Sequence, residues 1–253
     1  MLRIATCLLL LVAAARVASA DKVRVGPGTY RPIFPSQPSE REVKVAAFLL
    51  DRTPVTNAQY LAFVKAHPEW QRAKVKPLIA DERYLEHWAA ADRLGDARPN
   101  APVVRVSWFA ARAYCMAQGG RLPLEREWEL AAAASATHKD ASRDPEFQTQ
   151  VLSWYTQLSP RVLPDVGGAK NAWGVRDMHG LVWEWIEDFN AALVEPDSRD
   201  PNRKPFCGGA GATSRDPGAY AAFMRIALRS SLDGRSTTAV LGFRCAYDIK
   251  RRP

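Results

Sequence analysis

The chain has 253 residues, of which 47% are hydrophobic and 25% charged, a composition that excludes a disordered protein. Its length suits one large domain or two small ones. The formal net charge is +8, but the basic residues are scattered apart from a short run at 250–252. Because a nucleic-acid-binding protein needs a basic stripe or patch, we expect no nucleic-acid partner.

The first twenty residues predict a cleaved secretory signal peptide. Arg3 supplies a positive charge, residues 5–15 form an apolar run, and residues 18–20 read Ala-Ser-Ala, an A-x-A cleavage site. The apolar run is shorter than the roughly 20 residues that a membrane-spanning helix needs. We therefore expect a mature domain at 21–253, periplasmic or secreted, with no membrane span.

Three cysteines remain in the mature chain, Cys115, Cys207 and Cys245. Export would place them in a compartment where disulfides persist. Because three is an odd number, at most one intramolecular bridge can form and one thiol is left over. Composition alone leaves open which thiol that is.

The hydrophobic pattern predicts three helices and little other regular structure. After a turn region rich in Pro and Gly, residues 43–46 resemble a strand. Thr56 is an expected N-cap with Gln59 three residues later, which together form a capping box. The expected helices cover 56–67, 107–119 and 125–134. Beyond Ala134 the periodicity weakens, so we expect loops and short strands in an irregular α+β fold.

Four separate segments resemble signatures of the formylglycine-generating-enzyme, or sulfatase-modifying-factor, family. They span nearly the whole mature chain in the family's order. They are PVTNAQYLAFV at 54–64, PV…VSW…AYC…RLPLEREWE at 102–129, NAWGVRDMHGLVWEW at 171–185, and GG…RS…LGFRCA at 208–246. The resemblance implies a compact, loop-rich fold of the C-type-lectin-like kind.

The same resemblance implies a structural calcium site in the third segment. Asp177 and Glu184 would supply carboxylates, while Gly180 and Val182 would supply backbone carbonyl oxygens. Oxygen ligands of this kind suit a hard cation such as calcium. The alternative is a metal-free turn in which Glu184 only accepts hydrogen bonds.

The resemblance also implies a disulfide between Cys115 and Cys245, which would leave Cys207 as the free thiol. Cys207 stands directly before Gly208, where the family usually has Arg. One interpretation is a catalytic residue, acting as a redox thiol, a nucleophile or a metal ligand. The other is a buried small apolar residue, which is how most free cysteines behave.

Family enzymes hold copper with two cysteines spaced C-x4-C, but residues 208–244 of this chain contain no cysteine. Soft thiolate ligands are what Cu(I) requires. Depending on which neighbouring motif sets the register, the two positions hold Thr213 and Gly218, or Asp216 and Ala221. Formylglycine formation by the two-cysteine route is therefore not expected.

Asp216, Arg225 and Arg229 fall where family enzymes build a peptide groove, which makes them candidate substrate contacts. The four histidines form no ligand-spaced pair, and we expect a surface or packing role for His179. The first functional hypothesis is a monomeric, exported factor that matures a periplasmic protein or peptide by oxidation. It would use Cys207 or carboxylates, with copper or iron as the redox metal. The second is a non-catalytic, calcium-stabilised module that binds a partner protein.

Overall fold

The computed structural model describes residues 21–33, 41–156, 162–190 and 217–249. The expected signal peptide, Cys207 and Asp216 lie outside these described residues. Within them the chain forms five α-helices, one 3-10 helix and seven short strands, joined by long irregular segments. The expected α+β class is therefore confirmed.

The strands form three small sheets. They are β1 (Lys22–Val25), β2 (Gly28–Tyr30), β3 (Val43–Val45), β4 (Phe48–Asp51), β5 (Trp183–Glu184), β6 (Leu241–Gly242) and β7 (Ala246–Asp248). The largest sheet is antiparallel in the order β1-β4-β7, so Leu50 pairs with Val23 on one side and Ala246 on the other. β2 pairs with β3, and β5 runs parallel to β6.

Two helices occur where the sequence pattern predicted loops. The helices are α1 (Asn57–Ala66), α2 (Trp108–Ala117), α3 (Glu125–Ala132), α4 (Pro145–Thr156) and α6 (Pro217–Ser230), with the 3-10 helix η2 at Pro68–Trp70. The first three confirm the predicted helices, the third ending slightly early. The expectation of loops after Ala134 was wrong at both α4 and α6. The helix α4 begins where Asp144 accepts hydrogen bonds from two backbone N–H groups.

Local hydrogen bonds explain where the predicted helices begin and end. Thr56 and Gln59 form the expected capping box at the start of α1. At the end of α2, Gly119 adopts a φ of 74°. The amides of Gly119 and Gly120 then donate to the carbonyls of Met116 and Cys115. This pattern is a Schellman motif, which needs a left-handed residue and therefore favours glycine.

The larger of the two hydrophobic cores surrounds a disulfide between Cys115 and Cys245. Both cysteines are fully buried, with their Cα atoms 5.4 Å apart. Tyr60, Tyr114 and Phe243 pack around them with ring centroids 5.4–6.0 Å apart. The structure thus joins the pair that the family resemblance implies.

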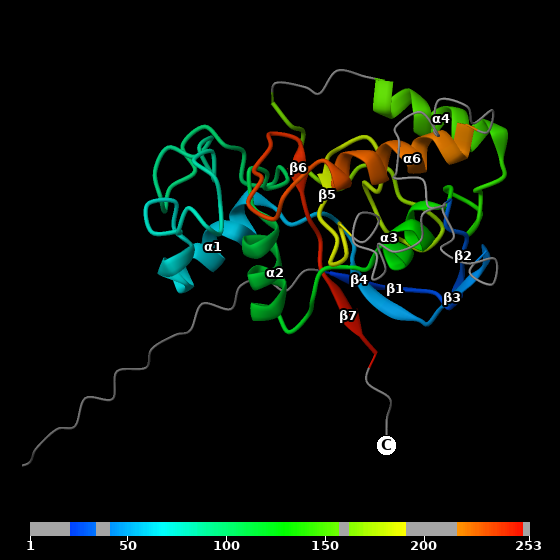
Figure 1. Ribbon diagram of the computed structural model, residues 1–253, viewed down its shortest axis with the longest axis horizontal. Coiled ribbons are helices and arrows are strands. Elements are labelled where there is room, and N and C mark those ends of the chain that lie inside the picture. Colours follow the sequence, from blue (N-terminus) through cyan, green and yellow to red (C-terminus); the bar gives the residue numbers. More distant parts are fainter. Residues whose placement is uncertain (1–20, 34–40, 157–161, 191–216, 250–253) are drawn as a thin grey trace, which may run out of the picture.

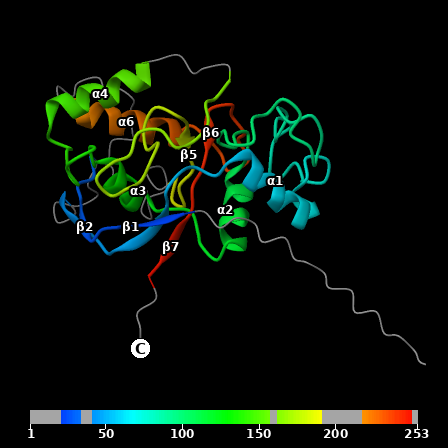
Figure 2. The ribbon, with the colours of Figure 1, turned by 180° about the vertical axis from the view of Figure 1, so that it is seen from behind.

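Figure 1 shows α4 and α6 side by side on one face of the molecule, with α3 beneath them and the three-stranded sheet beyond α3. The reverse view in Figure 2 shows the same arrangement, with α1 and α2 at the other end. Within the described ranges, the chain contains no helix that is both long and apolar enough to cross a bilayer.

Candidate functional site

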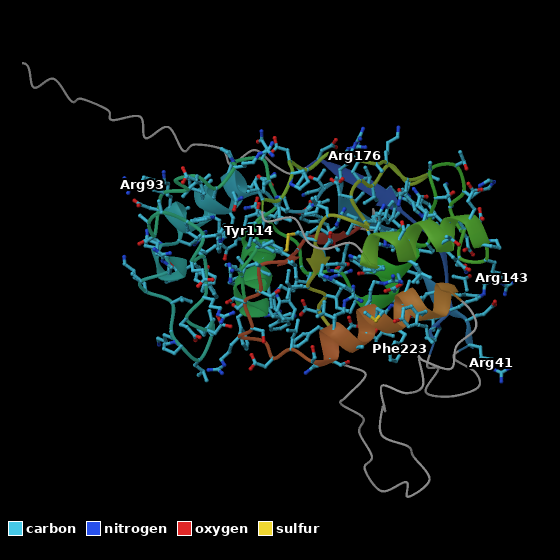
Figure 3. The ribbon with its side chains drawn as sticks, turned by 90° about the horizontal axis from the view of Figure 1, so that it is seen from above. Arg41, Arg93, Tyr114, Arg143, Arg176 and Phe223 are labelled. Carbon is cyan, nitrogen blue, oxygen red and sulfur yellow. A yellow bond between two sulfur atoms is a disulfide. The ribbon has the colours of Figure 1, made fainter. Side chains whose placement is uncertain are left out.

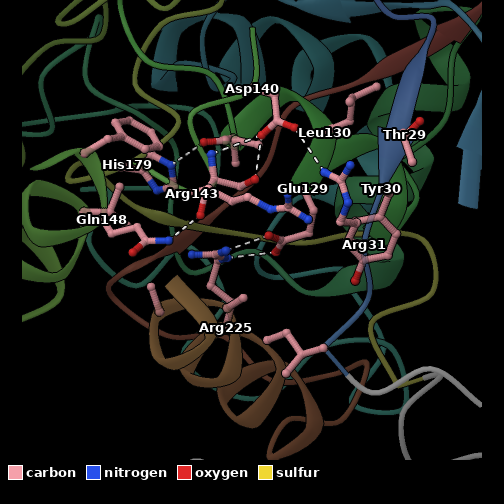
Figure 4. A pocket seen from close by; sticks show the side chains of 18 of the residues that line it. Thr29, Tyr30, Arg31, Glu129, Leu130, Asp140, Arg143, Gln148, His179 and Arg225 are labelled. Carbon is pink, nitrogen blue, oxygen red and sulfur yellow. Dashed lines mark hydrogen bonds and ion pairs between the residues drawn. The ribbon is translucent and has the colours of Figure 1, made fainter. Parts of the chain in front are cut away.

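A cavity of about 390 Å³ lies where β2, α3, α4 and α6 come together (Figure 4). This volume is near the lower end of the roughly 300–1,000 Å³ that small-ligand sites occupy. Its wall combines small and apolar side chains with five charged ones. The lining residues are Thr29, Tyr30, Arg31, Ile33, Glu129, Leu130, Ala132, Ala133, Asp140, Ser142, Arg143, Phe147, Gln148, Val151, His179, Ala221, Ala222, Arg225 and Ile226.

One face of α6 forms a wall of the cavity. Ala221, Ala222, Arg225 and Ile226 all line it, and residues four apart lie one above the other on a helix. The first two carry only a methyl group, which leaves open space beside the helix. If the register is counted back from Arg229 and Ser230, Ala221 is one of the two positions at which the family resemblance predicts a copper-binding cysteine.

A buried ion pair joins α3 to α6 inside this wall. Arg225 donates from Nε and Nη2 to the two carboxylate oxygens of Glu129, at 2.8 and 2.6 Å. Arg229, one helical turn later, places Nη1 3.5 Å from the same carboxylate and stacks its guanidinium on Trp128. Burial alone would raise the pKa of Glu129, but the two guanidiniums outweigh it and lower that pKa.

His179 closes the cavity on the side of α4. Its Nε2 lies 2.9 Å from the carbonyl oxygen of Ala132, so Nε2 carries the proton and Nδ1 accepts from the Tyr155 hydroxyl at 3.3 Å. The same hydroxyl accepts from Arg225 Nη1 at 3.2 Å. Burial, together with the charge of Arg225, lowers the pKa of His179 to about 4. The imidazole is therefore neutral at pH 7.

Tyr30 connects the cavity to a second group of acids. Its hydroxyl donates to Glu125 at 2.6 Å, and the backbone N–H of Glu125 donates to Asp188 at 2.7 Å. Burial raises the pKa of both carboxyl groups. These contacts hold β2 against the start of α3.

Of the three candidate substrate contacts, the structure describes two. Arg225 lines the cavity, and Arg229 lies behind it against Trp128. Sequence reasoning missed Glu129, which joins them, and it placed His179 in a surface or packing role rather than in the cavity wall. The signal for Glu129 was present, since it ends the segment EREWE that carries part of the family resemblance.

The turn predicted to bind calcium is tightly bonded within the protein. Glu184 is contacted by three N–H groups: Arg244 Nε, which is shared between both carboxylate oxygens, Arg244 Nη2 and Trp128 Nε1. These contacts occupy the roughly four lone-pair positions of a carboxylate. Asp177 accepts from the backbone N–H of Gly167 at 2.7 Å, and its carbonyl oxygen accepts from Arg244. Because the Arg244 guanidinium already neutralises Glu184, the carboxylates of this turn, as they are bonded, do not fit a calcium ion. The calcium site with Gly180 and Val182 stays a prediction of the family resemblance, to be tested by adding calcium.

A redox metal also finds no ligand set in the part of the chain that the structure describes. No three His, Cys, Asp or Glu side chains gather there in a way that could hold a metal ion. Cys115 and Cys245 are joined to each other, and α6 carries a methyl group at Ala221. The residues described at the cavity therefore do not fit a thiolate-bound copper ion.

Comparison with known proteins agrees with the motifs. The model of the family described as "Sulfatase-modifying factor enzyme 1-like domain" matches residues 10–249. A formylglycine-generating enzyme from Thermomonospora curvata is 31% identical, over 82% of this chain and 84% of that protein. A bovine relative named "Inactive C-alpha-formylglycine-generating enzyme 2" is 29% identical, over 84% of this chain and 81% of its own length.

Among solved structures, that of CarF has a similar fold. It aligns with a TM-score of 0.51 and 17% sequence identity, covering 91% of this chain and 99% of CarF. At this identity the likeness concerns the fold alone. Together with the family match, it confirms the α+β fold expected from the four sequence segments.

Proposed function

Because this chain belongs to the sulfatase-modifying factor enzyme 1-like family, we propose that it is an exported maturation factor without the family's two-cysteine copper chemistry. It would bind a segment of a periplasmic protein or peptide in the cavity between α3, α4 and α6. One observation carries this proposal. Ala221, which stands where a family cysteine is expected, lies in the wall of a cavity large enough for a ligand.

Ala221 in the cavity wall is compatible with ligand binding but not with copper chemistry at that position. A cavity at the expected active-site position supports retention of the binding function. Replacement of a thiol by a methyl group removes a soft ligand that Cu(I) requires. The name of the bovine relative, which includes the word inactive, supports a non-catalytic role in which this chain is a binding or accessory module.

Oxidation is the second candidate function, and the cysteine arrangement favours it. With Cys115 and Cys245 joined, Cys207 is the remaining thiol of the expected mature chain. An unpaired thiol in an oxidising compartment is open to redox chemistry. Copper or iron would be the redox metal of such an enzyme, and a periplasmic protein or peptide its substrate.

Photo-cross-linking tests the binding proposal. A benzophenone amino acid would replace Thr29, which lines the cavity, or Lys65, an exposed residue of α1 that serves as the control. The proposal expects a polypeptide adduct in the periplasm from position 29 and not from position 65. A second change, Ala222→Trp, should fill the cavity and remove the adduct, whereas Ala227→Trp on the same helix should not. Identical adducts from both positions, or none, would refute the proposal.

Metal analysis tests the oxidation candidate. The mature chain and its Cys207→Ala variant would be loaded with copper or iron, desalted, and measured by mass spectrometry. About one equivalent of metal in the parent, absent from the variant, would support a thiolate-dependent redox enzyme. Equal metal content in both proteins would leave binding as the remaining function.

A further inference from the structure

The side chains that line the cavity include three arginines and only two carboxylates. Glu129 is paired with Arg225, and Asp140 lies 3.2 Å from Arg31. Arg143 is the fifth charged residue of the lining. It is exposed to solvent and forms no ion pair or hydrogen bond with any other described residue. One positive charge at the cavity is therefore free to meet a ligand.

The other two arginines of the lining are less available. Arg31 donates to both Glu42 and Asp140. Arg225 is buried, and its donors are directed at Glu129 and at the Tyr155 hydroxyl. Both carboxylates of the lining are also paired, so a cationic ligand would find no free acid among the described lining residues and would meet Arg143. This arrangement favours an anionic ligand.

The inner wall is apolar. Leu130, Phe147, Val151 and Ile226 present hydrocarbon or aromatic surface, and α6 and the C-terminal end of α3 supply four alanines between them. His179 adds no charge, since its pKa is lowered to about 4, and both of its ring nitrogens are already hydrogen-bonded. An apolar side chain would therefore gain by burial here, at about 25 cal/mol per Å² of apolar surface removed from water.

The volume limits the size of the occupant. About 390 Å³ is enough for one or two amino-acid residues and too little for a larger element of structure. Figure 4 shows Asp140 next to Arg31, with Arg143 labelled between His179 and Glu129 and Arg225 on the opposite side from Asp140. A ligand can therefore bury an apolar group and still place an anionic group beside Arg143.

We infer that the cavity takes a polypeptide segment in which an apolar side chain is next to a carboxylate, and that Arg143 pairs with that carboxylate. The inference rests on the proposed function, because it identifies the segment that the partner protein presents. Arg143 is thus a specificity-determining residue, and Leu130, Val151 and Ile226 form the apolar subsite.

Calorimetric titration with three short peptides tests this inference. The peptides are acetyl-Gly-Ser-Phe-Asp-Ser-Gly-amide and its two variants, one with Asn in place of Asp and one with Gly in place of Phe. They are titrated into the mature chain and into Arg143→Gln. The matched control is Arg93→Gln, which removes an exposed arginine at the opposite end of the molecule (Figure 3).

We expect the parent to bind the Phe-Asp peptide about threefold to fivefold more tightly than the Phe-Asn peptide, as for an ion pair near the surface. Arg143→Gln should abolish this difference, and Arg93→Gln should keep it. The Gly-Asp peptide should bind weakest, since it leaves the apolar subsite empty. Equal binding of Phe-Asp and Phe-Asn by the parent, a preference that survives in Arg143→Gln, or no binding of any peptide would overturn the inference. The cross-linking experiment judges the proposed function independently, because it requires no particular peptide sequence.

Discussion

Replacing Glu129 with glutamine should destabilise the protein strongly. The substitution keeps the shape of the side chain but removes the carboxylate that Arg225 and Arg229 share. The side chains of Arg225 and Arg229 are only 7% and 4% exposed, so water cannot replace the lost partner. Removing one member of a buried ion pair typically costs about 3–5 kcal/mol, because it leaves an uncompensated buried charge.

The expected shift in melting temperature follows from the size of the chain. For domains of 150–250 residues, each kcal/mol corresponds to about 2–4 °C, so Glu129→Gln should lower the midpoint by about 6–20 °C. The matched control is Glu42→Gln, the same chemical change in an ion pair whose side chains are 39% and 61% exposed. An exposed pair contributes at most about 1 kcal/mol, so this variant should melt close to the parent.

The effect should also depend on pH. The pKa of Glu129 is lowered in the folded protein, so its stabilising effect is present above the unfolded value of about 4.3. It is lost as the pH falls through the folded value, and the gap between parent and Glu129→Gln should close in acid. Thermal denaturation followed by circular dichroism at pH 7.5 and below pH 4 measures both quantities. A variant that melts with the Glu42→Gln control at pH 7.5 would refute the reasoning.

Three other predictions concern the disulfide, His179 and the calcium turn. Replacing Cys115 and Cys245 with alanine opens a loop that spans 130 residues and gives the unfolded chain more conformational entropy. The free energy of unfolding, measured in urea, should fall by about 4–5 kcal/mol. A loss below about 1 kcal/mol would contradict this entropic argument. The imidazole of His179 should titrate near pH 4 when it is followed by NMR. Because the unfolded histidine takes up its proton first, the stability of the fold should fall as the pH drops from 6.5 towards 4. An NMR midpoint near 6.5 would show that the ring is solvated. Calcium and EGTA should leave the melting temperature unchanged, because Arg244 already neutralises Glu184, and a rise with calcium would restore the predicted site.

The sequence predicted the first half of the fold better than the second. The helices α1 and α2 begin after cap residues whose hydrogen-bond partners lie three residues further along the chain. Local patterns of this kind can be recognised in the sequence itself. The helix α4 also had such signals. Asp144 precedes Pro145, and Phe147, Val151, Trp154 and Tyr155 recur at helical spacing, but the surrounding polar residues obscured the pattern.

The cavity could be predicted only in part. Family resemblance pointed to Arg225 and Arg229, because the motif around them fixes their register. The pairing of Arg225 with Glu129 joins residues 96 positions apart, and such a pair follows from how α3 and α6 pack. The role of His179 likewise depends on α4, which supplies Tyr155 and a stacked Trp154 ring. No local pattern contains these contacts.

The sheet order β1-β4-β7 has a consequence for the way in which the chain is made. Its central strand, Phe48–Asp51, pairs on one side with residues near the start of the described chain and on the other with Ala246–Asp248. The same C-terminal stretch supplies Cys245, whose backbone N–H donates to Asp51. Contacts between residues this far apart form late, after their loop-closure entropy has been overcome. A nascent chain that stops before Ala246 lacks the outer strand, so translation must pass Asp248 before the domain can complete its sheet.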